Sequence, residues 1–117
     1  MSQERRRFPR VRCYLPVRFY PQGEIKVIET LTKDLGLGGL RVLSPVLKPV
    51  SIVLWVEISL WGEQSLSLPA QTVWFETIPR SEQFDLGIAF LDLSHENSER
   101  LSRYLERASD KLTPTKF

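Results

Sequence analysis

The amino-acid sequence predicts an all-β fold, a six-stranded antiparallel split β-barrel that is followed by one C-terminal α-helix. Between residues 14 and 90, apolar and polar residues alternate with a period of two in six segments that turn residues separate, which is typical of half-buried strands. After Asp92 the apolar residues recur at helical spacing instead. No segment shows the strand–helix alternation of a parallel sheet, so we expect the strands to pair antiparallel.

Each predicted strand is bounded by proline, glycine or another turn former. The six strands are expected at residues 14–20, 26–32, 39–43, 51–60, 65–75 and 84–90. Pro21 and Gly23, for example, mark the first turn. Trp55, Trp61 and Trp74 are expected in the core or at the rim of the barrel. The alternative for Trp74 is that its ring stacks on a base.

The C-terminal segment predicts a single helix over residues 94–113. Ser94 is a suitable N-cap, and Glu96 places negative charge in the first turn. The apolar positions form one stripe, which consists of Leu101, Tyr104, Leu105, Ala108 and Leu112. Pro114 ends the pattern. The chain is therefore expected to divide into a basic arm (1–12), a barrel (13–93) and a helix (94–113).

Length and composition fit a single globular domain. A chain of 117 residues can bury a core of its own. The best apolar run, Ile52 to Val56, is far too short to span a bilayer, and the basic N-terminal segment is not followed by the apolar stretch of a secretory signal. Cys13 is the only cysteine, which excludes an intrachain disulfide. We therefore expect a cytoplasmic protein without membrane insertion.

Positive charge is concentrated in the arm. The formal net charge of the chain is +2, but residues 1–12 hold five arginines against one acid, so the remainder carries a net negative charge. The five are Arg5, Arg6, Arg7, Arg10 and Arg12. A basic run of this kind suits an anionic partner, and the alternative is a solvated tail that binds nothing. Its like charges predict an arm that becomes ordered only when an anion binds.

Two segments of the sequence carry the candidate function. The first runs from Glu4 to Val11 and reads ERRRFPRV, and the second runs from Asp34 to Val42 and reads DLGLGGLRV. Together they resemble the PilZ family, whose signature is an RxxxR motif before the first strand and a [D/N]xSxxG motif further along the chain. The strand order, the final strand and the terminal helix fit the same family. The resemblance implies a receptor for cyclic di-GMP that passes the signal to a downstream effector protein and is not an enzyme.

The resemblance also implies a set of ligand-binding residues. They are Arg5, Arg6, Arg10, Asp34, Gly36 and Gly39. Arg6 and Arg10 fill the RxxxR positions, and arginine suits this ligand because its planar fork grips phosphate oxygens or the O6/N7 edge of guanine. Asp34 can accept hydrogen bonds from the N1 and N2 donors of guanine. Gly38 and Gly39 are expected to allow a close backbone approach and a positive φ in a tight turn.

Two positions leave the affinity and the stoichiometry open. Gly36 stands where the family usually has serine, and the missing hydroxyl is worth about 0.5–1.5 kcal/mol, or roughly two- to twelvefold in affinity. Arg5 precedes the RxxxR motif, and a third guanidinium there either holds a second, stacked copy of the dinucleotide or only adds to the positive field. No cofactor is expected, since cyclic di-GMP is a ligand.

Two other functions fit parts of the sequence. A PilZ-like protein-interaction adaptor that does not bind nucleotide is favoured by Gly36 and disfavoured by the arginines and Asp34. A small-barrel binder of single-stranded nucleic acid would use the basic arm as its grip. Acids balance the cations outside the arm, however, so nucleic acid is not expected as a partner.

The sequence shows no catalytic or metal-binding constellation. The only histidine, His95, lacks the further histidines or cysteines that a zinc site needs. Cys13 has no identifiable base beside it and is expected to be a packed thiol. Asp85 and Asp92 lie near strand ends without the partner that marks an acid–base pair.

Overall fold

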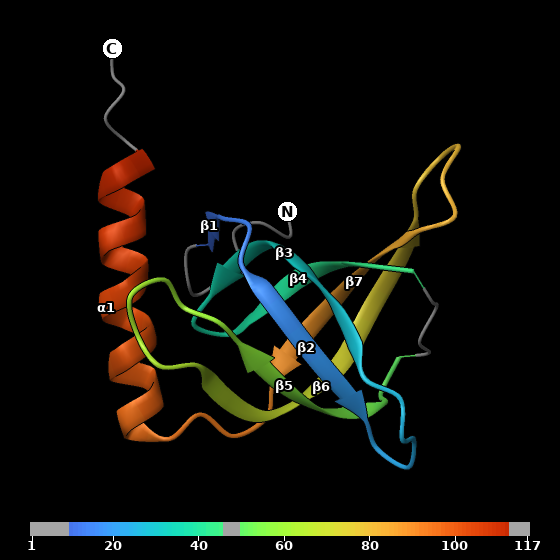
Figure 1. The fold of residues 1–117 in the computed structure, drawn as a ribbon, viewed down its shortest axis with the longest axis horizontal. Helices are drawn as coiled ribbons and strands as arrows, with labels where there is room; N and C mark the ends of the chain where they lie inside the picture. The colour runs from blue at the N-terminus through green and yellow to red at the C-terminus, as the bar shows by residue number, and fades with distance from the viewer. Residues whose placement is uncertain (1–9, 46–49, 113–117) are drawn as a thin grey trace.

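The computed structural model describes residues 10–45 and 50–112, with the side chains of Arg10 and of residues 109–112 excepted. This part of the chain forms a barrel of strands with one long helix beside it (Figure 1). The elements are β1 (Arg10–Arg12), β2 (Pro16–Pro21), β3 (Ile28–Gly36), β4 (Gly39–Ser44), β5 (Val53–Ile58), β6 (Leu66–Thr77), β7 (Phe84–Phe90) and α1 (His95–Leu112). No helix in these residues is long and apolar enough to cross a membrane.

Six strands, β2 to β7, close into an antiparallel barrel, which confirms the predicted fold class. The order along the sheet is β1-β3-β2-β5-β6-β7-β4, and an additional pairing between β3 and β4 closes the ring. β1 is an extra strand that pairs with β3. The sequence pattern assigns its residues to the arm, and they are a strand instead because β3 offers them backbone partners. β3 also runs to Gly36, past the predicted end at residue 32.

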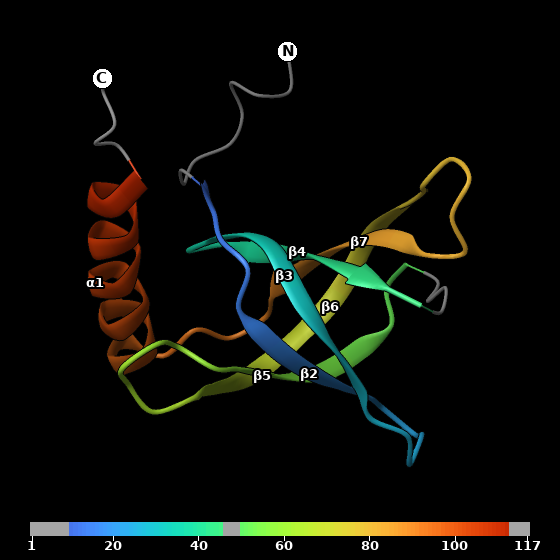
Figure 2. The ribbon, with the colours of Figure 1, turned by 45° about the horizontal axis from the view of Figure 1, so that its top comes forward.

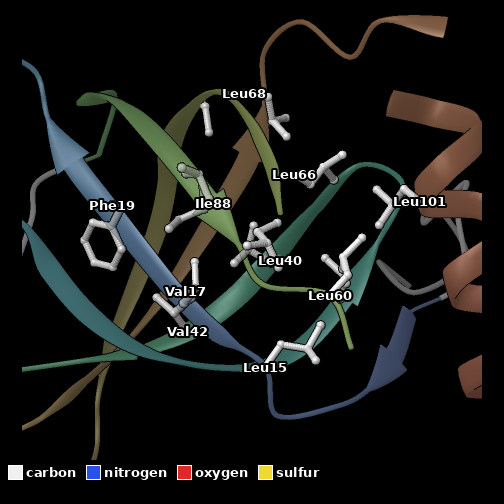
Figure 3. Close-up of a cluster of buried hydrophobic side chains, with 14 of the residues drawn as sticks. Leu15, Val17, Phe19, Leu40, Val42, Leu60, Leu66, Leu68, Ile88 and Leu101 are labelled. Atoms are coloured by element: carbon white, nitrogen blue, oxygen red, sulfur yellow. The ribbon is translucent and has the colours of Figure 1, made fainter. Parts of the chain in front are cut away.

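Alternate strand positions fill the barrel interior with aliphatic side chains. In β2, Val17 and Phe19 are buried while Arg18 between them is exposed, as the period of two predicts. Figure 3 shows side chains from several strands converging on one cluster, which Leu101 of α1 joins from the side. This apolar burial supplies the main favourable contribution to folding.

Two β-bulges interrupt the alternation. One lies between Thr32 and Asp34 in β3, and the other lies between Thr72 and Trp74 in β6. Both threonines point into the barrel, so a regular strand would place Asp34 and Trp74 inside as well. The extra residue at each bulge shifts the alternation by one position, and the next buried residue of β3 is Leu35. The bulges therefore turn Asp34 and Trp74 to the outside of the barrel.

The helix α1 lies beside the barrel and contacts β1 and β3 (Figure 2). Its inward stripe consists of Leu101, Tyr104 and Leu105, which are buried, and Ala108, which packs against them. The helix begins as predicted, because the Ser94 hydroxyl accepts a hydrogen bond from the Asn97 backbone N–H at 3.1 Å. The predicted helix is confirmed, and so is the packing of these four residues; the side chain of Leu112, the fifth member of the predicted stripe, lies outside the described residues.

Two arginines of α1 bind the turn between β5 and β6. Glu63 forms an ion pair with Arg107, and its Oε1 lies 4.0 Å from the Nε of Arg100. Arg100 also donates to the backbone carbonyl of Gln64. The Arg107 guanidinium lies over the Tyr104 ring, 5.9 Å from its centroid. These contacts fix the orientation of α1 relative to the barrel.

Candidate functional site

The β1–β3 pair brings the two sequence motifs together. Its antiparallel register places Arg10 opposite Gly36 and Arg12 opposite Asp34. The last arginine of RxxxR is therefore held by the backbone against Gly36, the third position of the second motif. Charged and glycine positions that are far apart in the sequence share one edge of the barrel.

Arg5 and Arg6 lie outside the described residues, and of Arg10 the structure describes the backbone alone. Arg6 is four residues before Arg10, so even an extended chain carries it no more than about 14 Å from that strand. The predicted contacts of these three arginines with a ligand stay predictions.

Asp34 faces the outside of the barrel and pairs with Arg41. The two residues are opposite each other in the β3–β4 register, and the Nε of Arg41 lies 3.0 Å from the Oδ2 of Asp34. Asp34 is the more buried partner, with 14% of its side chain exposed against 30% for Arg41. The site thus presents a negative and a positive group side by side.

Trp74 belongs to the same surface, where the alternative expectation for it, a ring that stacks on a base, would place it. Arg41 is opposite Gly87 of β7, and Gly87 is opposite Trp74 of β6. A Cβ added to Gly87 would lie 2.2 Å from ring atoms Cε2 and Nε1 of Trp74, so the indole lies directly over the glycine. We call the row of Asp34, Arg41, Gly87 and Trp74 the outer row.

None of the three tryptophans lies in the barrel core, so that part of the prediction is wrong. Trp74 covers Gly87, and Trp55 is on the outer face of β5 with 49% of its surface exposed. Trp61 lies in the β5–β6 turn at the rim, which agrees with the second expectation for these residues. The bulge next to Trp74 explains why alternation alone misplaces it.

The glycines of the second motif meet one expectation and contradict another. Gly39 is needed for a close approach, because a Cβ there would lie 2.1 Å from the carbonyl oxygen of Ile88 in the neighbouring strand. Gly36 is buried at the end of β3. Among the described residues, positive φ values at glycine occur at Gly23 and Gly62. The predicted positive φ at Gly38 and Gly39 is therefore wrong.

A hollow of about 400 Å³ adjoins β1 on the side of the helix. It is lined by Arg12, Cys13, Tyr14 and Leu15 from the barrel and by Trp61, Tyr104, Arg107 and Ala108 from the turn and α1. Arg12 borders this hollow and is also the register partner of Asp34. The surface next to the motifs is therefore rich in guanidinium and aromatic groups.

The surroundings of Cys13, His95 and Asp85 indicate packing and ion pairing, not a reactive site. Burial raises the pKa of the Cys13 thiol, which keeps it protonated and packed as expected. His95 is exposed and lies 3.2 Å from Glu99 one turn along α1. Asp85 is paired with Lys33 at 2.9 Å. The described residues hold no cluster of histidine, cysteine and acidic groups that would bind a metal.

A family model described as the PilZ domain matches residues 4–107. The match includes both motifs, the whole barrel and most of α1. The chain belongs to the PilZ domain family. No curated protein is similar enough in sequence to count as a match.

Solved structures of other proteins share the fold. The Bacillus subtilis inhibitor of motility (MotI/DgrA) superposes with a TM-score of 0.77 at 19% identity, over 92% of this chain and 53% of its own. The Escherichia coli YcgR PilZ domain with c-di-GMP gives 0.75 at 18% identity, over 92% of this chain and 93% of that domain. The PilZ chain described here therefore spans about half the length of MotI/DgrA.

Proposed function

We propose that this PilZ domain binds cyclic di-GMP at the outer row and the arm, and that it passes the signal to a downstream effector protein without catalysing a reaction. The observation that carries the proposal is the β1–β3 register, which sets Arg10 against Gly36 and Arg12 against Asp34. Family membership and the c-di-GMP named with the E. coli YcgR PilZ domain support it. The single cysteine suits a reducing compartment, and we propose a cytoplasmic location on that ground.

The chemistry of the residues matches the chemistry of this ligand. Cyclic di-GMP has two phosphates and two guanines, and the arm supplies guanidinium groups that suit both. The carboxylate of Asp34 faces outward on β3, where it can accept from the N1 and N2 donors of a guanine. Trp74 offers an aromatic surface at the other end of the outer row, and base–aromatic stacking is worth roughly 1–3 kcal/mol per base. A sub-micromolar to tens-of-micromolar affinity, about −8 kcal/mol, needs only a few such contacts.

Calorimetric titration of the protein with cyclic di-GMP tests the proposal. We expect saturable binding, and the stoichiometry will show whether Arg5 holds a second copy of the dinucleotide. The same titration with a single-stranded oligonucleotide at two salt concentrations tests the nucleic-acid alternative, because polymer binding weakens steeply with salt. Absence of binding by cyclic di-GMP at millimolar concentration would favour the adaptor that does not bind nucleotide.

A further inference from the structure

Arg41 occupies the centre of the outer row. It is opposite Asp34 on one side and opposite Gly87 on the other. Its neighbours in β4, Leu40 and Val42, point into the core, so Arg41 faces outward by regular alternation. Of all the described cations, it is the one that lies between the carboxylate and the indole of the site.

The hydrogen bonding of Arg41 is incomplete. Its Nε is buried and makes no hydrogen bond with the part of the chain that the structure describes, although Oδ2 of Asp34 is 3.0 Å away. The Nε–H is therefore not aimed at that oxygen, and the contact is an ion pair without a hydrogen bond. Buried donors that lack an acceptor are rare in folded proteins. A guanidinium in this state, at the centre of a candidate ligand site, suits an acceptor from outside the described residues, and a bound ligand can supply one.

The geometry points to Arg41 as a direct ligand contact that reads the O6/N7 edge of the guanine whose N1 and N2 donors bind Asp34. This inference rests on the proposed function and adds a specificity-determining residue outside the two motifs. The O6 and N7 atoms are both acceptors, and an arginine fork fits the pair. Adenine has an N6 amino donor in place of O6, so it would set a donor against the guanidinium. The Asp34–Arg41 pair would thus select guanine over adenine.

The alternative is that Arg41 only holds Asp34 in place through its charge. Two substitutions separate these roles. Arg41→Lys keeps the positive charge beside Asp34 but loses the planar fork, and Arg41→Met keeps the apolar stem without the charge. Arg18→Met is a matched control. Arg18 is also an arginine in a strand, but it is exposed and lies away from the outer row, where its Nε is 3.1 Å from Oε2 of Glu29.

The test is to measure the affinities of the wild-type protein and these three variants for cyclic di-GMP and for cyclic di-AMP, after a thermal melt has shown each variant to be folded. We expect Arg41→Met and Arg41→Lys to bind cyclic di-GMP about tenfold or more weakly, with little change for cyclic di-AMP and none for Arg18→Met. Full affinity for cyclic di-GMP in Arg41→Lys, or an equal loss of affinity for both dinucleotides, would show that Arg41 does not recognise the guanine edge. The proposed function would still stand. A wild-type protein that binds no cyclic di-GMP would instead refute the proposed function, and this inference with it.

Discussion

Lys33 is the extra residue of the β3 bulge, and its Nζ lies 2.9 Å from Oδ1 of Asp85 in β7. The side chain reaches across β4, because Asp85 is opposite Leu43 in the β4–β7 register. The pair is mostly shielded, with 31% of the lysine and 12% of the aspartate side chain exposed. The bulge that turns Asp34 outward is therefore held by an ion pair that takes no part in the outer row itself.

Loss of this ion pair should destabilise the protein. Lys33→Met leaves the Asp85 carboxylate shielded and without its cation, which we expect to lower the free energy of unfolding by about 1–2 kcal/mol. It should also weaken cyclic di-GMP binding, since Asp34 depends on the bulge for its direction. Urea unfolding and calorimetry measure the two effects. Arg18→Met, which breaks an exposed pair, should cost less than about 1 kcal/mol, and an equal cost in both variants would contradict this account.

The position of Trp74 depends on the missing side chain of Gly87. Gly87→Ala places a methyl group 2.2 Å from the indole, so the ring must leave its place over β7. We expect a shift of the tryptophan emission to longer wavelength and weaker ligand binding. Trp74→Phe separates the loss of the indole from the crowding of β7, because it removes the indole without adding a methyl group to the strand. If Gly87→Ala bound cyclic di-GMP as tightly as the wild type does, Trp74 would have no part in the site.

The barrel and the helix were predictable from the sequence because period and packing agree there. Leu66 and Leu68 alternate with polar residues and are buried as the period of two requires. Leu101 and Tyr104 lie on the predicted helix stripe and are buried against the barrel. In these segments the local pattern and the tertiary environment favour the same conformation.

The outer row was only partly predictable, since two features of it depend on contacts distant in sequence. A bulge is set by how two strands pair, and neither Lys33 nor Val73 differs in type from a regular strand residue. Alternation from Thr72 accordingly places Trp74 inside. β1 has three residues and forms because β3 offers an open edge. The outward direction of Arg41 could be predicted, because it stands between two buried positions. The family motif contains Asp34 and Gly39 but not Arg41, so the motif does not identify it as a site residue.

Arg10 is expected to be a major contact of the ligand. Arg10→Ala removes the guanidinium of the residue that is opposite Gly36 in the β1–β3 register. The loss of a charge-assisted hydrogen bond to the ligand should cost at least about 1.5 kcal/mol, which is more than tenfold in affinity. Calorimetry at constant salt measures the change. The control is Arg18→Ala, which removes the same charge from β2. An unchanged affinity in Arg10→Ala would show that the ligand binds elsewhere.

Gly36→Ser tests the departure from the family motif. Gly36 is not among the described glycines of positive φ, so its backbone conformation is open to serine. If the missing hydroxyl matters, the substitution should tighten cyclic di-GMP binding by up to about tenfold. Because Gly36 is buried, a thermal melt must accompany the titration. A folded variant with unchanged or weaker affinity would mean that this part of the site already has another donor.

The arm is expected to transmit ligand binding to the partner. The pairing of Arg10–Arg12 with β3 should protect their backbone amides from hydrogen exchange without any help from a ligand. The residues before Arg10 carry three further arginines and one acid, and their mutual repulsion opposes a compact arrangement. An anionic ligand shared by these guanidinium groups would reverse that repulsion.

We therefore expect cyclic di-GMP to increase amide protection upstream of Arg10 and to leave residues 10–12 nearly unchanged. The arm and ligand together would then form the surface that a downstream effector protein reads. Ordering costs roughly 1–2 kcal/mol per backbone residue, which sets a limit on the affinity and makes the response reversible. Hydrogen exchange with and without the dinucleotide measures the change, and Arg10→Ala provides the control, since it should abolish the added protection. Upstream amides that are already protected in the free protein and gain nothing on binding would contradict the switch and identify a preformed receptor.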